Sequence, residues 1–594
     1  MAVIGFDFGT TNSIISVVQG ERVVSFTDEQ GLPIPSVVCY EGMQKIVGRA
    51  ARERIGQTGL GVQGNVVRSP KSLIGHESVF VGGVERSPVD IVRDVVEFVR
   101  SQARLSTVIS DMAADHAVVT IPVNMDGRRR ALLRDAFRMA GISIVRFVHE
   151  PLAALYAHLR YTNDLDASLR RYDRQLFVVF DWGGGTLDLT LCRLIDGLLI
   201  QVGNDGTDEV GGDLFDDELK NEVERRVRAN RSLPAEVTVQ GGARTRLMHA
   251  CERAKIALSS RSRATIFVPN FFDGLDDTDL ELVLTRDEFE SIVRQLLNKG
   301  LARIEQLLES QGLSPASVAM CLATGGMANM PAIRSRLNEF FGPQRVHISE
   351  RSAALISEGA AWIAHDESKL HLAKNVELLL ARNSYMPLLH AGVELPKEGE
   401  VRREQFTLYC VDPTDGDGKF ELVSPNKAGP KVNRGDVRRH LANLVVRVDR
   451  HATPFRERLI LDIEIDENLI LRARARSTNE GHLMEAEIHD LEFALAFPGT
   501  GRSWLSEERA EGDDSSQVRH EAGALVMRSN VAADKNWDLV PGEVLYNLEP
   551  RRLDRGRGAP DIQVQERLYY QPCSLCGRPS HHPECRCSAH LYLN

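Results

Sequence analysis

The sequence predicts an α/β chain in which two related lobes precede a β-rich domain and a cysteine-rich tail. The first observation is a buried strand, 177–180, that ends on Asp181 and is followed by three glycines. The second is a similar arrangement near the N-terminus, where a strand over 3–6 leads to Asp7 and Gly9. Because strand, aspartate, aromatic residue and glycine come twice in the same order, we expect two related lobes that face one ligand.

The glycine-rich loop after the second strand predicts the kind of ligand. Gly183, Gly184 and Gly185 have no Cβ, so their backbone N–H groups can form a nest that favours phosphate. Asp181 and Asp188 would add negative charge beside the phosphates, which requires a cation between them. Mg²⁺, held through water by carboxylates and by phosphate oxygens, suits such a site. An ordinary glycine hairpin would explain one loop, but two loops indicate a clamp around a triphosphate.

Length and composition define the class of protein. The chain has 594 residues, 43% hydrophobic and 26% charged, which is typical of a globular chain with several structural units. Its formal net charge of −11 argues against a general nucleic-acid or membrane-surface binder. The first strand begins at Val3 and no apolar run is long enough to span a bilayer, so we expect a cytoplasmic protein.

Between the two loops the chain supplies further strands and a polar corner. The run 118–123 is another buried strand. The helix after it has apolar residues at helical spacing, namely Leu132, Ala136 and Met139. A third strand, 144–148, leads to Glu150 at a strand-to-helix corner, because Pro151 suits the first turn of a helix.

A later helix carries an apolar stripe with polar side chains along one edge. The stripe consists of Leu247, Cys251, Ala254 and Leu258. Glu252, Lys255 and Ser259 follow beside it, each within about a turn of the next. This edge is either a solvated helix face or a place where a ligand is held by hydrogen bonds.

Several motifs together resemble the nucleotide-binding domain of the DnaK-type heat-shock protein 70 chaperones. They come in the order of that family with similar intervals: 7–13, 71–75, 150–154, 181–188, 210–216, 252–259, 323–331 and 357–361. The resemblance covers residues 1–364. It implies an actin-like two-lobed ATPase with duplicated RNase H-like lobes, which couples ATP binding and hydrolysis to protein or peptide binding.

The resemblance also implies roles for single residues. Asp7 and Asp181 would hold Mg²⁺ through water, and Lys71 would touch the γ-phosphate. Glu150 and Thr186 would place the attacking water, and Pro151 resembles the nucleotide-sensing switch of the family. The residues expected to hold the phosphates are Gly9, Thr10, Thr11, Asn12, Gly183, Gly184, Gly185, Thr186 and Asp188. Further nucleotide contacts would come from Gly211, Gly212, Glu252, Lys255, Ser259, Gly325, Gly326 and Asn329.

Two positions depart from the pattern of the family. The family places an arginine, stacked on the adenine, where this chain has Asn329, so we expect weaker adenine binding. The order of Thr207 and Asp208 before Gly211 is also inverted. Neither departure removes a predicted phosphate or magnesium contact.

The C-terminal half matches the family more loosely. We predict the ATPase domain over 1–364, a linker over 365–375, a divergent, peptide-binding-like β-sandwich over 376–498, an irregular region over 499–565 and a Cys/His-rich tail over 566–594. The linker is polar, with only Leu370 and Leu372 in place of the apolar linker of the family, so we expect weak coupling between domains. The helical lid of the family is not found.

The tail contains a candidate zinc module. Cys573 and Cys576 form a Cys-x-x-Cys-Gly turn, and Cys585 and Cys587 supply two further thiolates, with His582 as a substitute for one of them. A disulfide pair and free surface thiols are the alternatives. The other cysteines, Cys39, Cys192, Cys251, Cys321 and Cys410, lie in apolar contexts and are expected to be reduced core residues.

The sequence is therefore interpreted as an ATP-hydrolysing chaperone of the DnaK type that uses ATP or ADP, Mg²⁺ and, in the tail, Zn²⁺. Its expected partners are an unfolded or dedicated client protein, a J-domain co-chaperone and a nucleotide-exchange factor, with no membrane or nucleic acid. One alternative is a sugar or acetate kinase on the same fold, which the motifs 71–75 and 252–259 disfavour. Another is a nucleotide-switched scaffold with little turnover, which the polar linker and missing lid favour.

Overall fold

The chain is described by a computed structural model that covers residues 3–105, 114–161, 164–349, 351–380, 384–410, 413–429, 431–453, 457–479, 481–500, 519–521 and 524–526. Two compact units make up the chain. The first contains residues 1–368 and 496–498, and the second contains 369–495. In the described part of the chain, no helix is long and apolar enough to cross a membrane.

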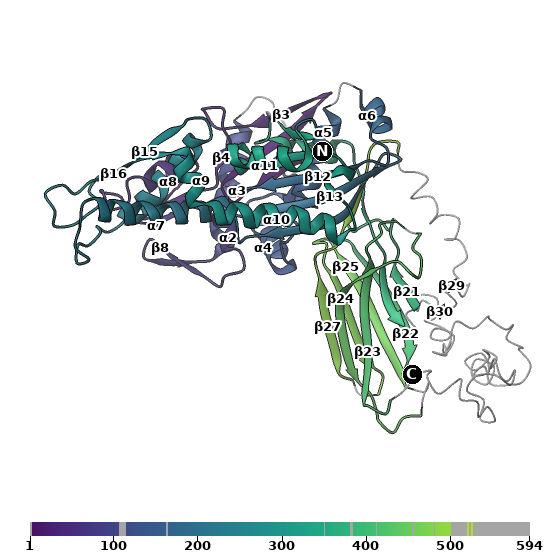
Figure 1. Cartoon of the computed structure of the whole chain (residues 1–594). Helices are drawn as coiled ribbons and strands as arrows, with labels where there is room; N and C mark the ends of the chain where they lie inside the picture. Colours follow the sequence, from purple (N-terminus) through teal and green to yellow (C-terminus); the bar gives the residue numbers. More distant parts are fainter. Residues whose placement is uncertain are drawn as a thin grey trace, which may run out of the picture. The chain divides into compact units, whose positions relative to one another are not determined.

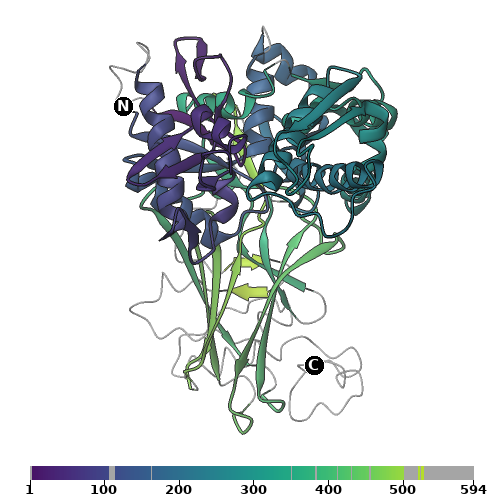
Figure 2. The same cartoon turned by 90° about the vertical axis from the view of Figure 1, so that its left-hand side faces the viewer.

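Two sheets with the same strand order form the centre of the first unit (Figure 1). One has the order β11-β10-β1-β2-β3, with bounds Ser143–His149, His116–Ile121, Ile4–Phe8, Asn12–Gln19 and Arg22–Phe26, and β4 (Ile34–Pro35) pairs with β2. The other contains five strands of this unit in the order β18-β17-β12-β13-β14, with bounds Val346–Ile348, Val318–Thr324, Leu176–Trp182, Leu187–Ile195 and Leu198–Thr207. In each sheet the third strand is parallel to one neighbour and antiparallel to the other. This repeat confirms the prediction of two related lobes, which Figure 2 shows side by side.

Two helices in equivalent positions pack against each other, and the second of them also packs against β1. Helix α5 (Glu150–Arg160) follows β11, and α12 (Leu355–His365) follows β18. A Cβ on Gly359 would overlap the carbonyl oxygen of Ala153, and a Cβ on Gly5 would overlap the backbone of α12. The two helices and the strand therefore meet at glycine backbones with no space for a side chain.

The longer helices of the first unit are α3 (Pro88–Arg104), α4 (Gly127–Met139), α7 (Gly212–Asn230), α8 (Ala243–Leu258) and α10 (Arg294–Ser310). In α8 the predicted stripe is confirmed, since all four of its residues are buried. In α4 the predicted buried face is correct at Ala136 and wrong at Leu132 and Met139. Leu133, Ala136 and Phe137 are buried there, and Met139 is 49% exposed. The rings of Phe137 and Phe6 pack edge to face with their centroids 4.8 Å apart, so the face of α4 that carries Phe137 points into the core.

Smaller elements complete the first unit. They are α1 (Arg49–Ile55), α2 (Pro70–Leu73), α6 (Leu165–Arg171), α9 (Arg286–Ile292), η1 (Pro315–Ser317), η2 (Gly326–Asn329) and α11 (Pro331–Phe341). The remaining strands are β5 (Val38–Glu41), β6 (Gln44–Val47), β7 (Val66–Val67), β8 (Val79–Val81), β9 (Val84–Arg86), β15 (Arg263–Val268) and β16 (Leu280–Thr285). The five cysteines outside the tail are buried, as predicted.

The second unit contains two four-stranded antiparallel sheets, which confirms the predicted β-sandwich. One has the order β21-β20-β23-β24, with bounds Ser384–Leu389, Val376–Leu380, Asp417–Pro425 and Arg438–Arg447. The other runs β22-β25-β26-β27, with bounds Val401–Tyr409, Arg458–Asp466, Leu471–Ser477 and Leu483–Ile488. Along β25 every second residue is buried, as expected for a strand with one face in a core.

The predicted linker, 365–375, does not form a separate segment: residues up to 368 belong to the first unit and those from 369 belong to the second. After α12 ends at His365, β19 (Leu370–Leu372) pairs with β28 (Phe493–Ala496). Lys374 is buried, and its Nζ lies 3.0 Å from Oε1 of Glu492, while Asn375 donates to Glu377 at 3.2 Å. Polar residues of this segment therefore belong to the interior of the second unit.

The chain returns to the first unit at 496–498, which the sequence assigned to the sandwich. The Phe497 ring stacks on Tyr156 of α5, with ring centroids 4.3 Å apart and planes at 8°. The Phe497 N–H also donates to the carbonyl of Gly197 at 3.1 Å. Both contacts lie within the first unit.

Most of the predicted irregular region, 499–565, and the whole predicted tail, 566–594, lie outside the described residues. Two short strands, β29 (Arg519–Glu521) and β30 (Ala524–Val526), pair antiparallel. The candidate zinc ligands Cys573, Cys576, Cys585 and Cys587 fall in the undescribed part.

Candidate functional site

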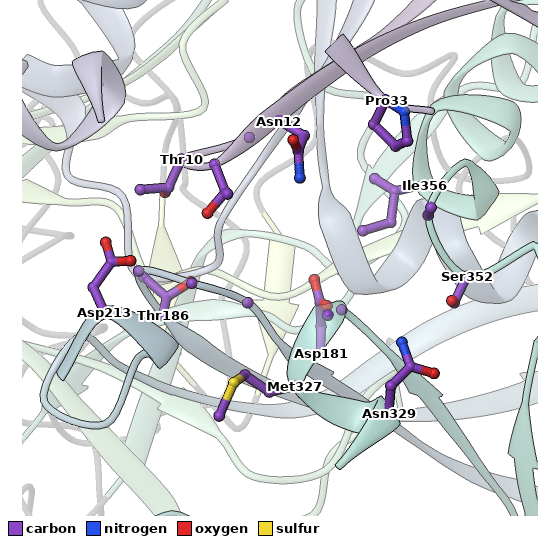
Figure 3. A pocket seen from close by; sticks show the side chains of 18 of the residues that line it. Thr10, Asn12, Pro33, Asp181, Thr186, Asp213, Met327, Asn329, Ser352 and Ile356 are labelled. Carbon is purple, nitrogen blue, oxygen red and sulfur yellow. The ribbon is translucent and has the colours of Figure 1, made fainter. Parts of the chain in front are cut away.

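A cavity of about 320 Å³ in the first unit is lined by residues from both lobes (Figure 3). Most of the residues predicted to bind the nucleotide line it: Asp7, Gly9, Thr10, Thr11, Asn12, Lys71, Glu150, Asp181, Gly183, Gly184, Gly185, Thr186, Glu252, Lys255, Ser259, Gly325, Gly326 and Asn329. Asp188, Gly211 and Gly212 are not among its lining residues.

The two glycine-containing loops have the same hairpin geometry and face each other. In the β1–β2 turn the Gly9 N–H donates to the carbonyl of Asn12 at 3.0 Å, and in the β12–β13 turn Gly183 donates to Thr186 at 2.9 Å. A Cβ on Gly185 would lie 2.9 Å from Oγ1 of Thr10. The loops therefore approach closely enough that a side chain at Gly185 would push them apart.

Gly211, Gly212 and Asp188 support the second loop from behind. The Gly212 N–H donates to the carbonyl of Gly183 at 3.1 Å, and a Cβ on Gly211 would overlap the backbone of that loop. Asp188 accepts a hydrogen bond from Oγ1 of Thr186 at 2.8 Å and another from the N–H of Val123 at 3.1 Å. The structure thus places these three residues around the loop and outside the cavity.

Lys71 and Glu150 form a buried ion pair, with Nζ 2.8 Å from Oε1. Lys71 lies in the short helix α2, and Glu150 is the first residue of α5. Asp7, at the end of β1, accepts a hydrogen bond from Oγ1 of Thr120 at 3.0 Å. Only the tertiary fold brings these side chains into one cavity.

The carboxyl groups around Lys71 carry more negative charge than one lysine balances. Burial, followed by repulsion from Glu150, raises the pKa of Asp7 and of Asp188 to about 7. The same causes raise the pKa of Asp181 well above its ordinary value. Asp7 is only half-buried, because one side of it faces the cavity. A divalent cation would neutralise this excess charge, so the residues fit a bound magnesium ion.

Among the described residues, no group of three or more His, Cys, Asp or Glu side chains is arranged to ligate a metal directly. The predicted role of Asp7 and Asp181, holding Mg²⁺ through water, does not require such a group.

We expect the affinity for Mg–ADP to fall as the pH drops from 8 to 6. A carboxyl with a pKa of about 7 is mostly protonated at pH 6, and a cation must displace that proton. Protonation of Asp7 would then weaken binding by about tenfold at pH 6. Calorimetric titration in two buffers of different ionisation enthalpy, corrected for titration of the nucleotide, measures both affinity and proton release. A constant affinity over this range would contradict the expected proton coupling.

Helix α8 supplies polar groups at another wall of the cavity. Glu252 accepts hydrogen bonds from Arg52 and, at 3.4 Å, from Arg68. Lys255 lies 2.8 Å from Asp216 and donates to the carbonyl of Gly212 at 2.8 Å. The predicted polar edge is therefore connected to the second loop through Lys255.

Several residues that line the cavity were not predicted from the sequence: Ile14, Pro33, Arg52, Pro122, Asp213, Ile256, Met327, Met330, Ser352, Ala353 and Ile356. Asp213 and Met327 lie inside matched motifs, and Ser352 to Ile356 lie just before another, so position next to a motif was the available signal. In Figure 3, Asn329, Ser352 and Ile356 lie on one side of the cavity, and Thr10 and Thr186 lie on the other.

Comparison with known proteins finds similarity to one family of chaperones. A family model described as "Hsp70 protein" matches residues 3–379. The "Chaperone protein DnaK" of Deinococcus deserti is 30% identical over 457 residues, which cover 72% of this chain and 69% of that protein. The protein of the same name from Deinococcus radiodurans gives the same identity and coverage. That of Mycoplasmopsis synoviae is 29% identical over 345 residues, or 58% of this chain and 55% of that protein.

Proposed function

The chain belongs to the Hsp70 family, and from this we propose that it is an ATP-dependent chaperone whose ATPase site is the cavity of the first unit. The observation that carries the assignment of the site is the meeting of two opposed glycine-containing loops with Lys71, Glu150, Asp7 and Asp181. ATP or ADP and Mg²⁺ are the cofactors, and the reaction is hydrolysis of the terminal phosphoanhydride.

Each group in the cavity has a distinct part in this proposal. Asp7 and Asp181 would hold Mg²⁺ through water, and the ion would neutralise charge on the phosphate oxygens. The facing loops bind the phosphates through backbone N–H groups and threonine hydroxyls. Lys71 contacts the γ-phosphate, and Glu150 with Thr186 orients the attacking water. Positioning and charge stabilisation then account for most of the acceleration.

The second unit would bind the client. A β-sandwich after the ATPase unit is where a peptide-binding domain is expected from the resemblance. The partners we propose are unfolded proteins, with a J-domain co-chaperone and a nucleotide-exchange factor as regulators, in protein folding and the response to stress. The cytoplasmic location stays a prediction.

ATP turnover, measured with and without unfolded peptides, tests this function. Stimulation by peptide is expected for a chaperone, because client binding and hydrolysis are coupled. Turnover that peptides leave unchanged would favour a nucleotide-switched scaffold for a dedicated partner. Phosphorylation of a sugar or of acetate would instead indicate a small-molecule kinase.

Zinc in the tail stays a proposal for residues outside the described chain. Protein purified without chelator is expected to carry about one Zn²⁺ per chain. Cys573→Ser or Cys576→Ser should remove the metal and leave ATPase activity unchanged, because zinc would fold a small separate module. Cys39→Ser, which alters a buried cysteine far from the tail in sequence, is the control and should retain the zinc. Metal analysis that finds no zinc in the unaltered protein would exclude the module.

A further inference from the structure

Asn329 lines the cavity and accepts a hydrogen bond from an arginine of the following helix. Asn329 ends the turn η2, and Arg334 lies in the first turn of the following helix, α11. Nη2 of Arg334 lies 3.0 Å from Oδ1 of Asn329, and its Nε donates to the carbonyl of Ala328 at 3.3 Å. The guanidinium is thus held to the turn at two points.

This contact determines which end of the Asn329 amide faces the cavity. A guanidinium has five N–H donors and no acceptor, so the atom that it contacts must be the amide oxygen. The NH₂ group then points away from Arg334. In Figure 3 the nitrogen of Asn329 is directed toward the side of the cavity that carries Ser352.

The surroundings of this NH₂ group suit a purine base. Near Asn329 the cavity is lined by Met330, the next residue along the chain, and by Ile356, which Figure 3 shows on the same side of the cavity; both offer apolar surface for the faces of a ring. The acidic groups and Lys71 belong to the part of the cavity that would take the phosphates. An adenine ring carries unprotonated nitrogens at its edge, and these accept hydrogen bonds from an amide NH₂.

We propose that Arg334 is a positioning residue for base recognition. It fixes the Asn329 amide so that the NH₂ group donates a hydrogen bond to a ring nitrogen of the adenine. Recognition of the base edge by Asn329 thus takes the place of an arginine stacked on the base. This inference rests on the proposed ATPase function of the cavity.

A double-mutant cycle on the full chain tests the proposal, with ADP affinity measured by calorimetry. Asn329→Ala and Arg334→Ala are each expected to weaken ADP by about fivefold, the equivalent of one net hydrogen bond. The double variant should be no weaker than Asn329→Ala, because Arg334 acts only through Asn329. Arg336→Ala is the matched control, since Arg336 lies on the same helix 3.7 Å from Glu339 and should leave affinity unchanged.

Base analogues identify the hydrogen bond itself. In the unaltered protein, either 1-deaza-ADP or 7-deaza-ADP should bind about fivefold more weakly than ADP. In Asn329→Ala and in Arg334→Ala this difference should disappear, a result that a purely structural role of Arg334 would not produce. Additive losses in the cycle, or equal affinity of all three nucleotides in the unaltered protein, would overturn the proposal. Absence of any ADP binding to the unaltered protein would instead reject the ATPase function together with it.

Discussion

Replacing Lys71 with alanine is expected to lower the single-turnover rate of ATP hydrolysis by about 10²–10³ and to leave nucleotide binding largely intact. The Lys71 ammonium is buried and lies 2.8 Å from Glu150, the residue proposed to orient the water. A fixed positive charge at this position stabilises negative charge that develops during transfer more than it stabilises the ground state. The loss should therefore appear in the rate and hardly in the dissociation constant.

The control for Lys71→Ala must be a lysine that also forms an ion pair but lies outside the cavity. Lys299→Ala serves this purpose, because Lys299 pairs with Glu209 at 2.6 Å on the surface of the same unit. This control should hydrolyse ATP at the unaltered rate. If Lys71→Ala keeps most of its single-turnover rate while its melting temperature is unchanged, the catalytic assignment of Lys71 is wrong.

Replacing Gly359 with alanine is expected to destabilise the first unit by about 3 kcal/mol or more, since overpacking costs about 1–3 kcal/mol even where side chains can move. Here the obstacle is backbone, because the added Cβ would overlap the carbonyl of Ala153 in α5. Helices α5 and α12 must then separate. Because α5 begins at Glu150, the shift would also displace the side chain that pairs with Lys71.

Chemical denaturation followed by tryptophan fluorescence, together with ADP titration, measures both consequences. Gly241→Ala is the matched control, since its Cβ meets nothing within 4 Å and its backbone is not in the left-handed region. The control should unfold at the same denaturant concentration as the unaltered protein. An equal midpoint for Gly359→Ala would mean that the helices can separate at little cost.

The sequence by itself determined the features that depend on neighbouring residues. Strand, aspartate and glycine in succession predicted both glycine-containing loops, because turn chemistry is local. The repeat of this order predicted the two lobes that the matching strand orders confirm. Helical spacing predicted the buried stripe of α8 at Leu247, Cys251, Ala254 and Leu258, and short alternating strands predicted the sandwich.

Only the tertiary structure decided which distant groups meet. Lys71 and Glu150 are far apart in sequence, and Lys374, which falls in the predicted polar linker, is buried against Glu492 in the fold. The buried face of α4 was predicted wrongly in part because Phe137 packs against Phe6 of β1. The spacing of apolar residues within the helix does not specify this contact with another element. Periodicity specifies that one face of an element is buried, but the pairing of buried charges and rings depends on packing between elements.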